Sequence, residues 1–479
     1  MEAPSAPNSA GLPFVTTHDP RGLLDTSGED VDPIAAKLAA DLVSSPLMLR
    51  SLDLSNVCEL NLKKAGLSAL PPQVGELSQL TKLDVSLSPL SDLPEAIGQL
   101  RNLRILFCLG CRFSSVPVVV GSLPSLYMLS FKSNQLVTIS PAALAPTLQW
   151  LILTDNQLEA LPITLPTGLR KVMLTNNKLR QLPAALVECA NLELIRLADN
   201  ALENLPAGLL TMPKLSWMGL AGNPIVTRGA ELAPLPAPRW VKPSELSFHE
   251  QIGAGGGGFV HRATWTSALG EPPVACAVKI FRGAASVTDG DPAHEIDLGE
   301  ALSHPNVIRV FGACPAPQLG LVLELLDGEW TELGLPPTFD TCTRDTYKAG
   351  ATFSIAQVLN TLRGVAAACA HLHAKRFTHG DLYAHNTMVR ASTGEAKVGD
   401  FGAAYDYEPL GPASAPLIER IEVRAFGCLA EELRGLLGES LLQTDSTSAT
   451  LGMLIEKCMS PDVGARPSFE DIVATLAVI

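Results

Sequence analysis

Long apolar runs and an excess of basic residues are both missing from this 479-residue sequence. No stretch reaches the roughly 20 apolar residues that span a bilayer. The first thirty residues lack the basic start and apolar core of a secretory signal. The formal net charge is -14, which disfavours binding along a phosphate backbone because such binding needs clustered Lys and Arg. We therefore expect neither a membrane span nor a nucleic-acid partner.

Cysteine is sparse, and its ten residues are spread over the whole chain. Disulfide-stapled secreted domains instead concentrate their cysteines in a short scaffold. This distribution predicts reduced thiols in a cytoplasmic protein. Cys108 and Cys111 form one C-x-x-C pair, and a single pair is a weak sign of a metal or redox site. With 47% hydrophobic and 18% charged residues the chain has the composition of folded domains.

A pattern, Leu-x-x-Leu-x-Leu-x-x-Asn, repeats through the N-terminal half at steps of 21 to 23 residues. Leucines at alternate positions point to one side of a short strand, and stacked units bury that row in one core. Cys108 takes an inward leucine position and Cys111 the asparagine position, which gives both a structural place. The units begin at Val57, Leu80, Leu103, Leu126, Leu148, Leu169, Leu192 and Leu215.

This repeat resembles leucine-rich repeat proteins over residues 49–226, in about eight units. The resemblance implies an α/β solenoid whose strand face binds protein. The outward strand positions here carry apolar side chains, and a contiguous exposed apolar patch is typical of a protein-binding site. We expect a protein partner on this concave face, unless the C-terminal half of the chain or a second copy covers it. The outward residues include Ile105, Phe107, Leu109, Met128, Trp150, Ile152, Met173, Leu194 and Trp217.

The ends of the repeat region differ from it in composition. Residues 1–32 are rich in Pro, Ser, Gly and Asp and predict a disordered tail. Residues 33–48 have helical spacing and predict a capping helix. The Pro-rich residues 227–244 predict an extended linker, so we expect two separate domains with a limited interface.

A glycine-rich segment opens the C-terminal half. Small residues let backbone N–H groups close over phosphates. A β-branched strand follows and ends at Lys279, which would reach the same phosphates, and Glu295 begins a helical stretch that can supply its partner. The segment reads Ile252, Gly253, Ala254, Gly255, then two glycines before Gly258, and Val260 two residues later.

Acidic residues and an amide follow in two short motifs. His379-Gly380-Asp381 is followed by Asn386, and Gly399 precedes Asp400. Brought to one cleft, these side chains supply oxygen ligands for Mg²⁺ and a carboxylate that orients a hydroxyl.

The motifs in this order resemble the protein-kinase family over residues 245–479. The resemblance implies an α+β bilobal fold that transfers the ATP γ-phosphate with Mg²⁺. It also implies that Leu323 gates the back of the nucleotide pocket and that Glu324 begins the hinge. The implied roles are nucleotide enclosure for Ile252, Gly253, Gly255, Gly258 and Val260, phosphate contact and ion pairing for Lys279 and Glu295, catalytic base for Asp381, and metal binding for Asn386 and Asp400.

Residues 379–386, which the resemblance implies form the catalytic loop, depart from the family at two positions. Gly380 stands where regulated kinases carry an Arg that receives an activation-loop phosphate. Tyr383 stands where serine/threonine kinases usually have Lys, which leaves the acceptor hydroxyl open. Gly299 also replaces a large apolar residue one turn after Glu295.

The segment after Asp400 is short. Only 21 residues separate it from Glu422, which resembles the family's acidic anchor, and no Ala-Pro-Glu lies between them. Arg466 is similar to the arginine that the protein-kinase family has in its last helices, and we expect Glu419 or Glu422 as its partner. The platform for a peptide substrate is therefore reduced.

These observations predict an ATP-dependent protein kinase, with serine or threonine as acceptor, whose repeats recruit a protein substrate or regulator. A nucleotide-binding pseudokinase scaffold is an alternative because the segment is short. His-Gly-Asp with Asn five residues after the Asp also resembles small-molecule kinases of the aminoglycoside and choline type.

Overall fold

The computed structural model describes residues 57–229, 232–255, 257–267, 272–282, 290–299, 301–316, 319–438 and 446–479. The tail expected at 1–32 and the capping helix expected at 33–48 lie outside the described residues. No described helix is long and apolar enough to cross a membrane.

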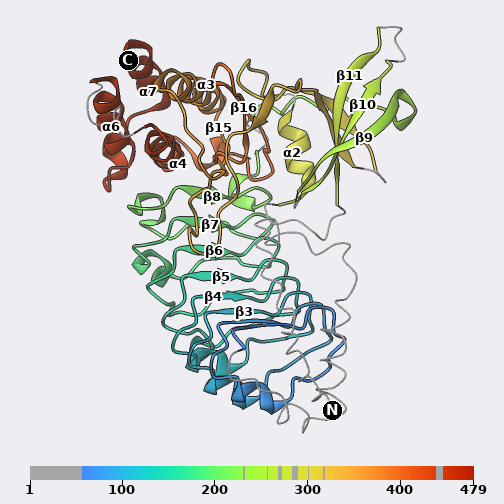
Figure 1. Cartoon of the computed structure of the whole chain (residues 1–479), viewed down its shortest axis with the longest axis vertical. Helices are drawn as coiled ribbons and strands as arrows, with labels where there is room; N and C mark the ends of the chain where they lie inside the picture. Colours follow the sequence, from blue (N-terminus) through green and yellow to red (C-terminus); the bar gives the residue numbers. More distant parts are fainter. Residues whose placement is uncertain are drawn as a thin grey trace, which may run out of the picture.

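The N-terminal half is a solenoid with one parallel strand from each repeat (Figure 1). Short 3₁₀ helices lie on the opposite side in most of the connections between these strands, for example Pro72–Glu76 and Glu95–Gln99. The strands follow chain order: β1 (Glu59–Asn61), β2 (Lys82–Asp84), β3 (Ile105–Phe107), β4 (Met128–Ser130), β5 (Trp150–Ile152), β6 (Lys171–Met173), β7 (Leu194–Arg196) and β8 (Trp217–Gly219).

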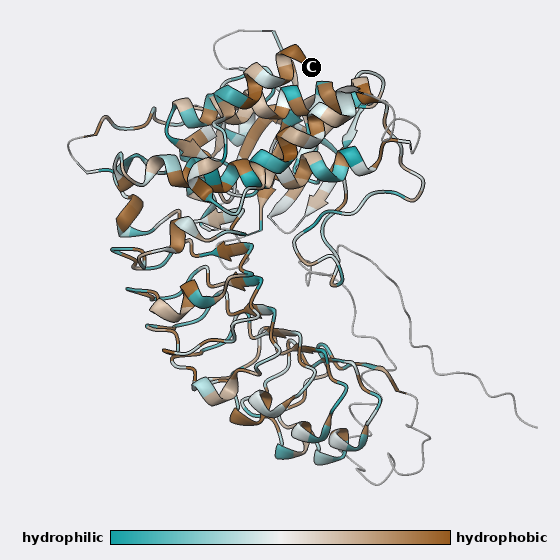
Figure 2. Ribbon diagram, turned by 90° about the vertical axis from the view of Figure 1, so that its left-hand side faces the viewer, coloured by the Kyte–Doolittle hydropathy of each residue, from teal (hydrophilic) through white to brown (hydrophobic). Residues whose placement is uncertain are grey.

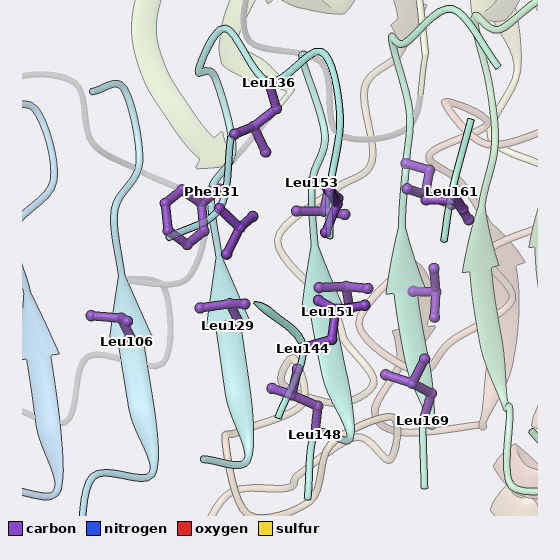
Figure 3. Packing of buried hydrophobic residues seen from close by; sticks show 14 of the residues in the cluster. Leu106, Leu129, Phe131, Leu136, Leu144, Leu148, Leu151, Leu153, Leu161 and Leu169 are labelled. Atoms are coloured by element: carbon purple, nitrogen blue, oxygen red, sulfur yellow. The ribbon is translucent and has the colours of Figure 1, made fainter. Parts of the chain in front are cut away.

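Leucines fill the interior of each coil, and Figure 3 shows Leu106, Leu129 and Leu151 from neighbouring strands side by side. The repeated asparagines satisfy the turn backbone. Asn156 donates to the carbonyls of Phe131 and Leu153, both at 2.9 Å, and its Oδ1 accepts from the backbone N–H of Leu136 in the preceding coil at 3.0 Å. A buried carbonyl without a hydrogen-bond donor is costly. The asparagine of each repeat supplies that donor, which explains why Asn recurs.

The C-terminal half has two lobes. The first is an antiparallel sheet in the order β12-β13-β11-β10-β9, against which helix α2 (Pro292–Gly299) packs. Its strands are β9 (Leu246–Gly255), β10 (Gly258–Trp265), β11 (Val274–Phe281), β12 (Val310–Cys314) and β13 (Gly320–Glu324).

The second lobe is mainly helical, and the predicted fold class is confirmed in both halves. Two small sheets, β14-β16-β17 and β15-β18, carry the loops between the helices. The elements are β14 (Trp330–Glu332), α3 (Ile355–Ala374), β15 (Phe377–Thr378), β16 (Thr387–Arg390), β17 (Glu395–Val398), β18 (Tyr405–Asp406), α4 (Ala415–Gly435), α6 (Ser446–Cys458) and α7 (Phe469–Val478).

The expectation of a limited interface between the halves is wrong. The helical lobe lies directly on the last coils of the solenoid (Figures 1 and 2). Met173, Leu194 and Trp217 are buried in the core of the helical lobe. In the other direction, Tyr407 and Ile418 belong to the core of the solenoid. The two hydrophobic cores therefore interlock.

The expectation that the concave apolar residues face solvent is also wrong. Met128 and Trp150 are 0% and 1% exposed, because residues 335–347, between β14 and α3, lie on them. Phe339 contacts Phe107 at a ring-centroid distance of 5.9 Å, and the Trp150 indole donates to the Cys342 thiol. Of the proposed partner-site residues, Phe107 and Ile152 are half-buried, and Met128, Trp150, Met173 and Trp217 are buried. The C-terminal half covers this face, which is the alternative that the sequence left open.

Candidate active site

The glycine-rich segment forms the hairpin between β9 and β10. Gly253 pairs with Val260, and Gly255 with Gly258. A Cβ at Gly258 would lie 2.1 Å from the carbonyl oxygen of Ile280, so only glycine fits beside β11. Ile252 is exposed at the edge of β9. The hairpin thus places its backbone over the strand that carries Lys279.

Lys279 lies at the centre of an ion-pair cluster. Its Nζ is 2.9 Å from both carboxylate oxygens of Glu295 and 3.1 Å from Oδ1 of Asp400. Burial alone would lower the pKa of Lys279, but the Asp400 and Glu295 carboxylates outweigh burial and raise it. Lys279 in turn lowers the pKa of Asp400. The lysine is therefore a fixed cation that joins α2 to the end of β17.

The catalytic loop brings Asp381 and Asn386 together. The amide Nδ2 of Asn386 donates to Oδ2 and to the backbone oxygen of Asp381, both at 2.9 Å. The backbone N–H of Gly399 donates to the backbone carbonyl oxygen of Asn386 at 2.9 Å. This bond connects the loop to the residue before Asp400. The Nε2–H of His379 donates to the Gly399 carbonyl at 3.0 Å.

Asn386 and Asp400 fit a Mg²⁺ ion by their chemistry. The Asp400 carboxylate is exposed, and the Asn386 amide turns its nitrogen toward Asp381, which leaves its oxygen for a cation. Mg²⁺ takes few protein oxygens and completes its shell with water and phosphate. No group of three or more His, Cys, Asp or Glu suited to a metal occurs in the described part of the chain.

Leu323 and Glu324 are the last two residues of β13. Leu323 is half-buried beside the α2 face of the sheet. Glu324 ends β13, and its carboxylate accepts from Lys397 at 2.7 Å and from the backbone of Arg309 at 2.8 Å. Glu324 thus connects the two lobes at the back of the site.

Glu422 anchors the catalytic loop from α4. It is buried and accepts from Thr378 Oγ1 at 2.6 Å and from the backbone N–H of Gly380 at 2.9 Å, and its other oxygen lies 2.8 Å from His373. Burial alone would raise the pKa of Glu422, but the bonds from His373 and Thr378 lower it. Because the anion receives several donors, the loop is held rigidly.

The expected pairing of Arg466 with Glu419 or Glu422 is wrong. Arg466 donates to the carbonyl oxygens of Ser460, Arg420 and Pro213, at 2.9, 3.0 and 2.7 Å. Burial lowers its pKa to about 10. Pro213 lies in the solenoid, so the arginine that would brace a peptide platform braces the repeat region.

The solenoid supplies site residues that the sequence did not reveal. The Arg196 guanidinium donates to the Gly380 carbonyl at 2.8 Å and pairs with Oδ1 of Asp381. Trp217 stacks on Tyr383, with ring centroids 4.5 Å apart and planes at 5°. Arg196 occupies an outward strand position, where a charge is ordinarily solvated, so periodicity gave no sign of it. The available signal was that positions 380 and 383 lack the Arg and Lys that kinases usually carry there, which leaves room for a cation from another part of the chain.

Known protein families match both halves. A family of protein tyrosine and serine/threonine kinases matches residues 246–411, and the leucine-rich repeat family matches residues 167–225. The receptor tyrosine-protein kinase erbB-4 of Mus musculus is 25% identical over 279 residues, which are 49% of this chain and 20% of that protein.

Relatives of both acceptor classes occur. The Arabidopsis thaliana serine/threonine-protein kinase GRIK1 is 31% identical over 120 residues, 24% of this chain and 26% of its own. The Mus musculus mitogen-activated protein kinase kinase kinase 10 is 28% identical over 289 residues, 50% of this chain and 29% of its own. The chain spans less than a third of the length of each relative. It thus combines a leucine-rich repeat region with a protein kinase domain.

Proposed function

We propose that this chain is an ATP-dependent kinase that phosphorylates serine or threonine in a protein. One observation carries the proposal: Lys279 contacts Glu295 at 2.9 Å and Asp400 at 3.1 Å, beside the Asp381–Asn386 pair. That set holds the cation, the metal ligands and the base that phosphoryl transfer needs.

Each residue has a part in the proposed reaction. Gly253, Gly255 and Gly258 cover the phosphates with backbone N–H groups, between Ile252 and Val260. Lys279 neutralises the phosphates while Glu295 fixes it. Asn386 and Asp400 would hold Mg²⁺, which would offset charge on the transferring group. Asp381 orients the hydroxyl and accepts its proton, while Leu323 and Glu324 line the adenine side.

The preference for a small hydroxyl side chain follows from the short segment after Asp400. Tyr405 and Tyr407 are buried against the solenoid, so this segment offers little platform for a tyrosine ring. Recruitment of a protein substrate or regulator then falls on the start of the solenoid, where Glu59 and Asn61 of β1 are exposed. All ten cysteines are free thiols, which supports a cytoplasmic location.

A nucleotide-binding scaffold without turnover is the second candidate, because Arg196 already occupies one oxygen of Asp381. The full chain is incubated with Mg²⁺ and labelled ATP, and phosphorylated sites are mapped by mass spectrometry. Wild type should transfer phosphate, and Asp381→Asn should lose about 10²–10⁴-fold in rate, since a positioned base contributes that much. Asp92→Asn, at an exposed solenoid site, is the matched control and should equal wild type.

The outcomes separate the candidates. Tight ATP binding with no transfer, and an Asp381→Asn variant indistinguishable from wild type, would favour the scaffold. Label found on tyrosine alone would overturn the acceptor assignment and keep the kinase.

A further inference from the structure

A buried arginine from the repeat region reaches the proposed catalytic base. Arg196 ends β7 and is 2% exposed. Its guanidinium donates to the Gly380 carbonyl at 2.8 Å and pairs with one oxygen of Asp381, whose other oxygen accepts from Asn386 at 2.9 Å. The carboxylate is thus fixed from two sides, by its own loop and by the solenoid.

The catalytic loop is shaped for this contact at Gly380. Gly380 has φ +70°, and a Cβ there would lie 2.5 Å from the carbonyl oxygen of Ala403 and 3.1 Å from that of Met218. Met218 belongs to β8. An arginine at position 380, as regulated kinases have, would collide with the docked solenoid.

The loop is also shaped for it at Tyr383. This residue stands where serine/threonine kinases usually place a lysine near the base. Its ring instead stacks on Trp217, whose indole N–H donates to the Leu382 carbonyl at 3.0 Å. The two loop positions that could carry a cation are therefore given to contacts with the repeats, and the cation beside Asp381 comes from β7.

The solenoid and the helical lobe share a buried apolar interface. Trp217, Met173 and Leu194 lie in the core of the helical lobe, and separation would expose them to water. It would also break the ion pair between Arg196 and Asp381. Because apolar burial of this kind is typical of obligate interfaces, Arg196 stays in place during turnover.

The same coil also reaches the other lobe. Asp199, three residues after Arg196, lies 2.9 Å from Nε2 of His294 in α2. The next residue of α2 is Glu295, the partner of Lys279. One repeat therefore contacts the elements that carry the base and the elements that carry the phosphate-binding lysine.

We propose that Arg196 is a positioning residue of the kinase site, supplied by the repeat region in place of the cation that the catalytic loop lacks. This rests on the proposed function. In that reaction the substrate hydroxyl oxygen bonds to the γ-phosphorus, its proton goes to Asp381, and the bond to the bridging oxygen breaks with its electron pair leaving on ADP. Arg196 keeps its protons throughout and holds the carboxylate toward the hydroxyl.

Steady-state kinetics of the full chain test this role. Arg196→Ala should lower kcat about tenfold to a hundredfold, with KM for ATP changed less than about threefold, because the nucleotide contacts remain. The kcat of Arg196→Lys should lie between those of wild type and Arg196→Ala, and added methylguanidinium should restore part of the rate of Arg196→Ala. The control is Arg228→Ala, which removes an ion pair between the start of the linker and the kinase domain, at 2.9 Å to Glu408, and should keep kcat while lowering Tm.

The outcomes are distinct. An Arg196→Ala enzyme as fast as wild type, or faster, would overturn the positioning role, and a faster one would make the contact inhibitory. If Arg228→Ala also loses kcat, to the same extent as Arg196→Ala, and neither methylguanidinium nor lysine at position 196 restores the rate, the effect is structural and the positioning role is overturned. If Arg196→Ala does not fold, Arg196→Lys decides alone. Wild type without any turnover would remove the proposed function and, with it, this role.

Discussion

Glycine at position 380 meets both a backbone and a packing requirement. Its φ of +70° lies in the left-handed region, where a side chain is strained. Its missing Cβ leaves room for the carbonyl oxygens of Ala403 and Met218. The residue therefore links the shape of the catalytic loop to the approach of β8.

Replacing Gly380 with alanine should destabilise the protein by roughly 2–4 kcal/mol, the sum of backbone strain and a steric clash. Denaturant unfolding of the full chain measures the loss. Gly328→Ala is the control, since nothing lies within 4 Å of a Cβ there, and it should change stability by less than about 0.5 kcal/mol. Equal stability of the two variants would mean that β8 does not approach the loop.

At the scale of elements, β7 and the turn after it contact α2 through a histidine. Burial alone would lower the pKa of His294, but the bond to Asp199 and the charges of Asp291 and Asp297 raise it above 6.5. The protonated ring is the form that pairs with Asp199. This contact therefore stabilises the fold fully below about pH 6.5, and its contribution is lost as pH rises through the raised pKa.

Asp199→Asn should lower the pKa of His294, because burial then acts with less opposing charge. The stability difference between wild type and variant should be larger at about pH 6 than at about pH 8. Imidazole NMR of His294 and denaturant unfolding at both pH values measure this, with Asp92→Asn as the control. A His294 that titrates below 6.5 in wild type would contradict the pairing.

Single elements were the part best predicted from the sequence. The repeat placed Leu129 and Leu151 inward because strand periodicity determines the side of each residue. Motif order brought Lys279, Glu295 and Asp400 together, as found. The extended linker was predicted only in part, because its end joins the five-stranded sheet beside β12. There Val241 is buried, and its backbone N–H donates to the carbonyl oxygen of Ala313 at 2.8 Å.

At the scale of the whole molecule, the sequence could not show what covers the concave face. An outward Trp150 has the same periodicity whether a partner, a second copy or the chain itself lies on it. The deciding contacts come from residues 335–347, which have no motif, and from Arg196, which lies 185 positions from Asp381. Such distant contacts leave no local pattern.

The same segment also fastens the catalytic loop to the solenoid side. His385 Nδ1 lies 2.8 Å from Asp345, whose other oxygen accepts the His385 backbone N–H at 3.0 Å. Asp345 and Cys342 belong to one segment, so the loop is connected to the covered face both directly, through Arg196, and indirectly. The kinase domain and the repeats therefore form one structural unit.

Hydrogen exchange of the full chain, with and without Mg²⁺ and a non-hydrolysable ATP analogue, tests this unity most directly. Peptides from residues 194–219 and 378–386 report on the two sides of the contact. The account predicts that both are protected and that their exchange rates are the same when nucleotide is bound, since the solenoid stays docked in the working enzyme. Loss of protection in both peptides on adding nucleotide would contradict it, because the solenoid would then leave the site before catalysis.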